Sequence, residues 1–224
     1  MAYLNEAQHQ IVSDAVAAAE LTTSGEIVTV LADRSDGYTD VVMVYAAAGA
    51  FTLMSLFALF PAFFMGVWDS LIGGWMHEWT TGELASMTIG LGLLAFTITW
   101  LKFLYEPLRF FAIPGPVKTA RVHAQAIKHF KVGAEARTHG RTGILIYLSM
   151  REHRAEIIAD RPIAEKVSAD VWGEAMVDML HHIREGSIAE GMAAGVRDVG
   201  AVLSEHFPRA DDDENELPDR LIEV

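Results

Sequence analysis

Two long stretches of the sequence consist of uncharged, mostly apolar residues. The first runs from Val41 to Trp68 and the second from Leu84 to Leu101, and neither contains Asp, Glu, Lys or Arg. A helix of about 20 apolar residues crosses the hydrocarbon core of a bilayer. We therefore predict two transmembrane helices, over about residues 41–68 and 84–105. Pro61 is expected to kink the first helix, and a buried core helix is the alternative for the second run.

The segment between the two runs is short and acidic, since residues 69–83 contain Asp and Glu but no Lys or Arg. Basic residues flank the runs on their outer sides, with Arg34 before the first and Lys102 and Arg109 after the second. Positive charge favours the cytoplasmic side of a membrane. The pattern predicts a hairpin in the bacterial inner membrane with both termini cytoplasmic. Small residues such as Gly49 would permit close helix contacts, and hence a homo-oligomer formed through the transmembrane helices.

The sequence on either side of the hairpin changes between helical and strand patterns. Apolar residues recur at helical spacing after a capping-box sequence that starts at Asn5, and again from Val117 onward. Runs rich in Ile, Leu and Val, bounded by turn residues, predict strands. The expected helices cover about residues 5–20, 117–130, 163–183 and 188–203, and the expected strands cover residues 26–31, 143–149 and 155–159.

The first soluble piece, residues 1–37, is too short to bury its own strand. We therefore expect it to complete a domain with residues 114–208: an α/β sandwich with a mixed sheet of three or more strands and helices on both faces. The transmembrane hairpin, residues 38–113, would be an insertion into that domain. Residues 209–224 are acidic and show no periodicity, so we predict a disordered tail.

Composition excludes several kinds of function. The chain has 17 Lys and Arg against 30 Asp and Glu, a net charge of -13, and no cysteine. The acidic balance argues against nucleic acid as a partner, and the lack of cysteine excludes disulfides and thiolate metal ligands. The sequence has no GxxxxGK[ST] phosphate loop and no serine in a nucleophile-elbow context. Nucleotide hydrolysis and acyl transfer are therefore not supported.

Four segments resemble the TPM domain, in particular its bacterial membrane form. They are TSGEIVTV at residues 23–30, RTGILIYLS at 141–149, AEIIAD at 155–160 and IAEGMAAG at 188–195. The resemblance covers roughly residues 4–37 and 117–208, and it implies an α/β sandwich. Through plant thylakoid relatives it implies acid phosphatase activity and a part in photosystem repair, and through some bacterial relatives it implies binding of calcium or other divalent ions on acidic loops.

The sequence departs from the common family pattern at two places. Many members have Asp-Asn-Gly where this chain has Arg141-Thr142-Gly143, and many have a glycine-rich turn where it has Asp160-Arg161-Pro162. A carboxylate can ligate a hard cation, whereas a guanidinium group cannot. The exchange argues against metal-assisted phosphatase chemistry.

Five residues are candidates for a site. Asp33, Asp36 and Asp160 each follow a predicted strand. If the first and third strands end at the same edge, the three carboxylates could meet and hold Ca²⁺ or Mg²⁺; ordinary turn residues are the alternative. Arg141 and Arg161 flank the same predicted edge and could hold a phosphate or carboxylate, with surface salt bridges as the alternative.

Two functions follow from these observations. The first is a non-catalytic module, anchored in the lipid bilayer, whose cytoplasmic TPM-like domain binds a protein partner during assembly or maintenance of a membrane complex. The second is a divalent-metal-dependent phosphatase of the acid type, with the three aspartates as ligands. The charge-free hairpin and the lost acidic triplet favour the module.

Overall fold

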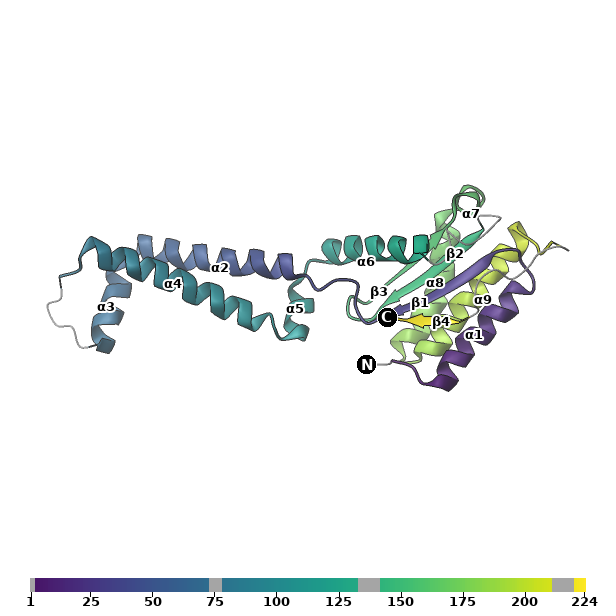
Figure 1. Cartoon of the computed structure of the whole chain (residues 1–224), viewed down its shortest axis with the longest axis horizontal. Helices are drawn as coiled ribbons and strands as arrows, with labels where there is room; N and C mark the ends of the chain where they lie inside the picture. The colour runs from purple at the N-terminus through teal and green to yellow at the C-terminus, as the bar shows by residue number, and fades with distance from the viewer. Residues whose placement is uncertain (1–2, 73–77, 133–141, 211–219) are drawn as a thin grey trace. The chain divides into compact units, whose positions relative to one another are not determined.

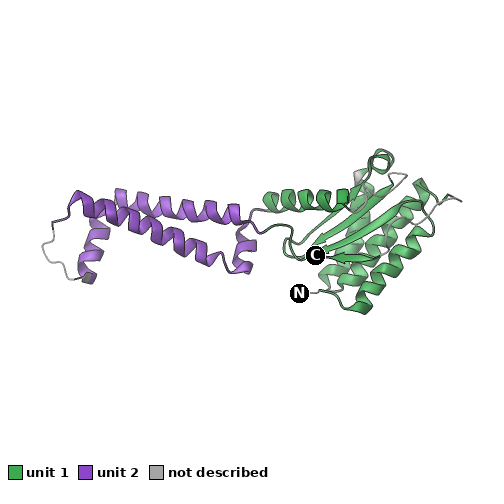
Figure 2. Ribbon diagram, viewed as in Figure 1, with its two compact units in different colours: residues 1–36, 115–224 green, residues 37–114 purple. Residues whose placement is uncertain are grey.

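The computed structural model describes residues 3–72, 78–132, 142–210 and 220–224. The chain forms two compact units, one made of residues 1–36 with 115–224 and the other of residues 37–114 (Figure 2). The first is called the sheet unit below, and the second the hairpin unit.

A mixed sheet is the centre of the sheet unit (Figure 1). Among the described residues its four strands are β1 (Glu26–Ala32), β2 (Gly143–Ser149), β3 (Arg154–Ala159) and β4 (Leu221–Glu223), in the order β3-β2-β1-β4. Strand β1 runs parallel to β2 and to β4, whereas β2 and β3 are antiparallel. The central pair thus consists of one strand that precedes the hairpin unit in the sequence, β1, and one that follows it, β2. The predicted mixed α/β fold is confirmed.

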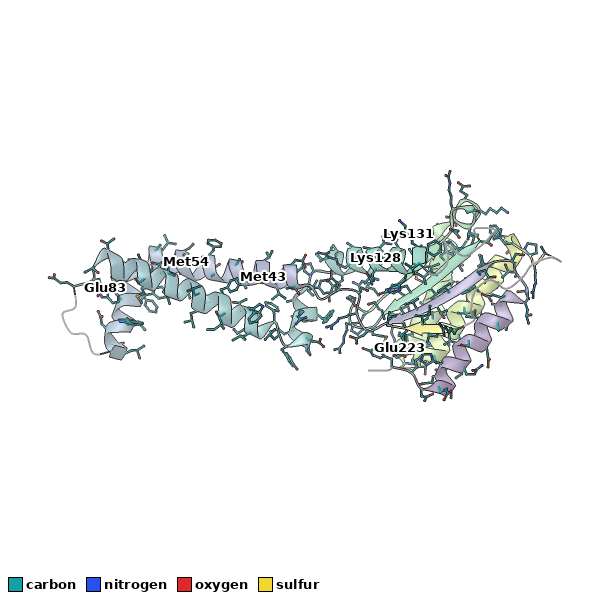
Figure 3. The ribbon with its side chains drawn as sticks, in the orientation of Figure 1. Met43, Met54, Glu83, Lys128, Lys131 and Glu223 are labelled. Carbon is teal, nitrogen blue, oxygen red and sulfur yellow. The ribbon has the colours of Figure 1, made fainter. Side chains whose placement is uncertain are left out.

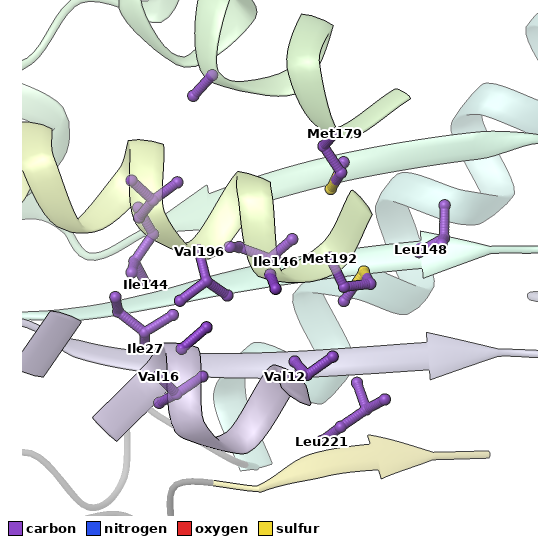
Figure 4. Packing of buried hydrophobic residues seen from close by; sticks show 14 of the residues in the cluster. Val12, Val16, Ile27, Ile144, Ile146, Leu148, Met179, Met192, Val196 and Leu221 are labelled. Carbon is purple, nitrogen blue, oxygen red and sulfur yellow. The ribbon is translucent and has the colours of Figure 1, made fainter. Parts of the chain in front are cut away.

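Helices cover both faces of the sheet, as predicted. One face carries α1 (Glu6–Glu20), α8 (Ala169–Arg184) and α9 (Ile188–His206), and the other carries α6 (Gly115–Phe130). A short helix, α7 (Arg161–Lys166), follows β3. Successive side chains of a strand point to opposite faces. Ile27, which Figure 4 labels, and Leu31 therefore join the core under α1 and α9, while Val28 and Val30 join the core under α6.

Local sequence explains how the helices on the first face begin and pack. The predicted capping box is present at α1, where the Asn5 side chain accepts from the Gln8 amide at 2.9 Å and the Gln8 side chain accepts from the Asn5 amide at 3.0 Å. Helix α9 approaches α1 closely at Gly200, where an added Cβ would lie 2.6 Å from the Cβ of Ala19. A glycine at this position therefore sets the spacing of the two helices.

The hairpin unit contains α2 (Thr39–Leu59), α3 (Pro61–Ile72), α4 (Thr81–Lys102) and α5 (Glu106–Ala112). The expectation of one helix over residues 41–68 is wrong, because α2 ends at Leu59 and a new helix starts at Pro61. Proline has no N–H to donate and its ring clashes with the preceding turn, so it is tolerated at the start of a helix but not inside one. The expected second helix corresponds to α4, which begins and ends three residues earlier than predicted.

Helices α2 and α4 pack against each other at small residues. An added Cβ at Gly92 would lie 2.7 Å from the sulfur of Met54, and one at Gly49 would lie 3.0 Å from Thr99 Oγ1. Both helices are long and apolar enough to cross a membrane, yet only 17% of the most apolar window of α2 and 6% of that of α4 is buried. Their outward surfaces are therefore apolar and exposed.

The end of the sequence differs from the prediction. Residues 211–219 lie outside the described residues, but Leu221–Glu223 form β4, so the predicted disorder of residues 209–224 is wrong for these three. Leu221 is 5% exposed and belongs to the core under α1 and α9, where Figure 4 shows it with Val12 and Val16. Two apolar residues in a short acidic segment were enough to complete the sheet.

Candidate functional site

The three predicted metal ligands, Asp33, Asp36 and Asp160, do not meet. Asp33 and Asp36 follow β1 at the edge of the sheet where Ser149 ends β2. Asp160 follows β3, which is antiparallel to β2, and therefore lies at the opposite edge beside Gly143, where β2 begins. Strands that run in opposite directions end at opposite edges. The prediction of one site made of three carboxylates is therefore wrong.

The two carboxylates that do share an edge are each engaged by neighbouring side chains. The hydroxyl of Tyr3 donates a short hydrogen bond to Asp33, and Arg151 Nε lies 3.2 Å from the same carboxylate oxygen. The hydrogen bond from Tyr3, followed by that from Arg151, holds the pKa of Asp33 below its ordinary value although partial burial opposes this. Asp36 forms an ion pair with Arg121, in which Nε and Oδ2 are 3.3 Å apart. This geometry is that of ion pairs at the end of a sheet.

A buried polar cluster lies at the same edge and consists of Ser35, Tyr147, Ser149 and Glu152. Glu152 is 1% exposed, and its two carboxylate oxygens accept from the Ser35 amide at 3.0 Å and the Ser149 hydroxyl at 2.5 Å. The Ser35 hydroxyl donates to Ser149 Oγ at 2.9 Å and lies 3.0 Å from the Tyr147 hydroxyl. The cluster ties the loop after β1 to the end of β2 and to the turn that follows it.

Sequence reasoning missed this cluster, although a signal was present. Tyr147 and Ser149 are two residues apart in a strand, so they point to the same face of the sheet. Glu152 lies in the tight turn from β2 to β3, in which His153 has a φ of 51° in the left-handed region. The turn directs the Glu152 carboxylate inward, although two of its residues, Arg151 and Glu152, are charged.

Helix α6 closes the cluster from above the sheet. The ring of His129 stacks on that of Tyr147, with centroids 5.6 Å apart. Burial lowers the pKa of His129 and raises the pKa of the Tyr147 phenol, because in both cases the charged form is poorly solvated. Both groups are therefore neutral at neutral pH. The cluster consists of hydroxyl groups and one carboxylate, and the His129 ring packs on its Tyr147 side.

The opposite edge holds Asp160, which is 6% exposed. Its carboxylate accepts from the Gly143 amide at 3.0 Å, and its own amide donates to the Gly143 carbonyl at 2.9 Å. An open pocket of about 420 Å³ adjoins it, lined by Phe130, Lys131, Ala159, Asp160, Arg161, Pro162 and Glu165. The pocket contains two basic side chains, but the buried carboxylate of Asp160 serves the end of the β2–β3 hairpin.

Of the two arginines that were predicted to bind an anion, Arg161 is a described residue and lines this pocket. Its side chain is 88% exposed, and its Nε lies 2.6 Å from Glu165 Oε1 one helical turn away. Arg141 lies outside the described residues. Exposed pairs of this kind contribute little to stability. The arrangement of Arg161 is that of a surface salt bridge, the alternative that its sequence position left open.

The hairpin unit has a larger pocket of about 800 Å³, beside the start of α4. Its walls are mostly apolar and aromatic, with Trp68 from α3, Trp79, and Leu91 and Leu94 from α4. Glu83, which Figure 3 labels near the start of α4, lines the pocket and forms the capping box of α4 with Thr80. Tryptophan is favoured at the boundary between water and lipid, so this pocket has the composition of a membrane-interface surface.

No group of three or more His, Asp or Glu side chains suited to a metal ion occurs within the described parts of the chain. The chemistry that the residues do support is hydrogen bonding and ion pairing at the two edges of the sheet. A Ca²⁺ or Mg²⁺ ion is therefore not assigned to any set of these residues.

The architecture defines the class of protein: an α/β sandwich around a mixed sheet, with an apolar helical hairpin inserted between its two central strands. Residues 118–202, from α6 to α9, match the family model of the TPM domain. This part of the chain is therefore similar to the TPM domain, as the resemblance predicted. The sheet unit also includes residues before the hairpin, because β1 lies beside β2 in one sheet.

A solved structure has the same fold. It is the NMR structure of the BA42 protein from the psychrophilic bacterium Bizionia argentinensis, which is 17% identical to this chain. The match covers 100% of this chain and 97% of the other, with a TM-score of 0.57. At this level of identity the likeness shows the fold alone. No curated protein matches the sequence.

Proposed function

We propose that the protein is a membrane-anchored TPM domain protein whose sheet unit binds a protein partner on the cytoplasmic side of the bacterial inner membrane. Helices α2 and α4 cross the bilayer as a hairpin, and the sheet unit is assembled from the two segments that flank them. The partner is a component of a membrane complex whose assembly or maintenance the module serves.

The observation that carries this proposal is the exposed apolar surface of the hairpin unit. Side chains such as Phe51 and Leu93 are 69% and 65% exposed, and the helices that hold them are charge-free along their centres. Burying that surface in lipid removes it from water, which stabilises the unit in proportion to its area. A core helix of a soluble protein would have this surface covered by the rest of the chain.

The cytoplasmic orientation is supported by charge. Arg34 precedes α2, while Lys102 and Arg109 follow the apolar part of α4, and the segment between the spans contains Asp and Glu but no Lys or Arg. The parallel pairing of β1 with β2 requires both flanking segments on one side of the membrane. An even number of spans satisfies that requirement.

A binding role is favoured over a phosphatase by the state of the acidic side chains. Asp33 and Asp36 are paired with arginines, and Asp160 accepts a backbone amide at the other edge. The name of the matching family model refers to a phosphatase. The direction of β3 argues against a site built from these three aspartates, because Asp160 lies at the opposite end of β2 from Asp33 and Asp36.

Membrane anchoring is tested by extraction. The protein is expressed in a bacterium, and membranes are washed with alkaline carbonate, which strips peripheral proteins. We expect it to remain in the pellet and to enter solution only with detergent. Release by carbonate alone would contradict the proposed anchor.

Orientation is tested by labelling single cysteines, because the chain has none of its own. Gln10→Cys and Glu205→Cys lie in exposed positions of the sheet unit, and Glu78→Cys lies between the two spans. A membrane-impermeant maleimide applied to intact spheroplasts should label only Glu78→Cys. Labelling of Gln10→Cys or Glu205→Cys before lysis would place the sheet unit outside.

Catalysis is tested with a generic aryl phosphate, using the full chain in detergent with and without Ca²⁺ or Mg²⁺. We expect rates equal to those of Asp33→Asn and Asp160→Asn. Ion-dependent turnover that either variant abolishes would overturn the non-catalytic reading.

A further inference from the structure

Strand β4 is the outermost strand of the sheet, beside β1, and few contacts hold it there. The position that it occupies along β1 is called the β1 edge below. Strand β4 pairs in parallel with β1 over Thr29 to Leu31 only. Beyond the strand, the Val224 amide donates to the Leu31 carbonyl at 3.0 Å, and the Asp33 amide donates to the Val224 carbonyl at 2.8 Å. A three-residue edge strand is marginally stable by its backbone bonds alone, so its side chains decide its position.

Three side chains of β4 fit three different environments. Leu221 enters the core under α1 and α9, and Ile222 packs on the opposite face against the core under α6. The Glu223 carboxylate accepts a short hydrogen bond from the Tyr3 amide and lies 3.0 Å from His9 Nε2, both on the segment that includes α1. Figure 3 marks Glu223 at this edge. The surroundings of the β1 edge thus suit a strand with two apolar residues followed by a carboxylate.

The groups that hold β4 belong to the rest of the sheet unit, chiefly to β1 and to the segment of Tyr3 and α1. Among the described residues that precede β4, Arg209 and Ala210 contact Thr22 and Ser24. In the part of the chain that the structure describes, strand β4 itself pairs with β1 alone. It therefore occupies this edge as a short strand whose fit is set by three side chains.

We propose that β4 is a displaceable strand, and that the β1 edge it occupies is the docking surface for an extended peptide of a partner protein with the same pattern, two apolar residues followed by a carboxylate. The peptide adds a parallel strand to the sheet, which is a recurrent mode of peptide recognition. This inference deepens the proposed binding function, because it names the partner's chemistry. The resident β4 competes with the partner in cis.

The competition has a measurable size. Because β4 and the edge that it occupies belong to one chain, β4 competes as an intramolecular ligand, for which effective concentrations of about a millimolar are common, so β4 fills its own edge most of the time. The apparent affinity for a foreign peptide falls by the fraction of molecules in which the edge is open. Removing or releasing β4 should therefore strengthen binding of an added peptide by about tenfold or more.

The experiment uses a reversible lock. Val30 and Ile222 are paired neighbours in β1 and β4, and Val30→Cys with Ile222→Cys introduces the chain's two thiols. The probe is a fluorescein-labelled peptide of residues 220–224, Arg-Leu-Ile-Glu-Val, followed by fluorescence anisotropy with the full chain in detergent. We expect no binding to the oxidised, locked protein, weak binding to the wild type, and binding about tenfold tighter than the wild type by a chain that stops at residue 220.

Two controls make the result specific. A peptide with Lys in place of Glu223 should not bind, because the Tyr3 amide and His9 would face a cation. Reduction of the locked protein should restore binding of the peptide without any further change of sequence. Where the shortened chain loses its fold, as judged by near-ultraviolet circular dichroism, the comparison of reduced and oxidised protein decides alone.

Two outcomes would overturn the inference. Equal anisotropy for the oxidised and reduced forms, with both folded, would mean that the β1 edge does not take a foreign strand. Oxidation to a covalent dimer in place of an intrachain lock would show that a second copy supplies β4. Either outcome leaves the proposed membrane anchor untouched, because anchoring is read from carbonate extraction, and the two proposals can fail separately.

Discussion

The acidic side chains near the carboxyl ends of β1 and β2 have different structural roles. Asp33, Asp36 and Glu152 all lie near these ends, yet Asp33 and Asp36 pair with arginines and Glu152 is buried among hydroxyl groups. Which role each has depends on the neighbour that the fold supplies.

Asp33 provides a prediction on pH. Its pKa lies below the ordinary aspartate value chiefly because Tyr3 donates to it, so its contribution to stability is present above about pH 4 and is lost as the pH falls through the folded-state pKa. In Tyr3→Phe the pKa of Asp33 should rise toward the ordinary value. The measurement is the carboxyl carbon chemical shift of Asp33 against pH. Arg151→Gln is the comparison and should also raise this pKa, because it removes both the guanidinium hydrogen bond and its positive charge.

Glu152 provides a prediction on stability. Glu152→Ala leaves the Ser35 amide and the Ser149 hydroxyl without their acceptor in a buried place, and we expect a loss of about 2–3 kcal/mol. Glu152→Gln keeps one acceptor oxygen and should lose less. Thermal unfolding followed by near-ultraviolet circular dichroism measures both changes. Glu205→Gln, at an exposed position, is the matched control and should be neutral; a Glu152→Ala protein as stable as that control would contradict the assigned role.

The sequence located these groups only in part. Turn residues after apolar runs correctly placed Asp33, Asp36 and Asp160 at strand ends, because each run ends where polar letters begin. Which edge an end belongs to depends on strand direction, and no property of Asp160 itself encodes that. The inward direction of Glu152 likewise depends on the turn geometry at His153 and not on its charge.

At the scale of elements, the hydrophobic pattern predicted the positions of the strands, and Pro61 marked the end of a helix where this pattern did not. The strands over residues 143–149 and 155–159 were anticipated within one residue, since their apolar runs are short and bounded. The single helix over residues 41–68 failed at Pro61, where the uncharged pattern continues but the backbone cannot. The uncharged composition of a segment indicates an apolar environment, whereas a proline indicates where its helix must end or bend.

The contact between α1 and α9 provides a prediction on packing. In Gly200→Ala the new methyl group would lie 2.6 Å from the Cβ of Ala19, so the helices must separate, and we expect a loss of about 1–3 kcal/mol. Gly173→Ala in α8 is the matched control, because its Cβ would meet nothing within 4 Å and alanine favours helix by about 1 kcal/mol. Opposite shifts of the thermal midpoint are expected. Two shifts of the same sign would contradict the close contact.

At the scale of the whole molecule, the hairpin unit is an insertion between the two central strands. A version in which residues 37–114 are replaced by a flexible Gly/Ser linker should be soluble without detergent and retain the mixed sheet. Loop length costs little free energy, and the core on both faces comes from the sheet unit. Circular dichroism and hydrogen exchange of the β1 amides measure this. Aggregation of the shortened chain, with the full chain folded in detergent, would show that the hairpin is needed for the fold.

The parallel pairing of β1 with β2 also constrains how the protein is made. About 110 residues separate the two strands, and a ribosome adding about 5–20 residues per second takes roughly 5–20 seconds to supply the second one. During that interval the nascent β1 lacks its β2 neighbour. Under the proposed membrane anchor, the two apolar helices enter the bilayer in the same interval, so folding of the sheet unit would depend on the insertion machinery. A span that fails to integrate would leave β1 and β2 on opposite sides of the membrane, and the sheet could not form.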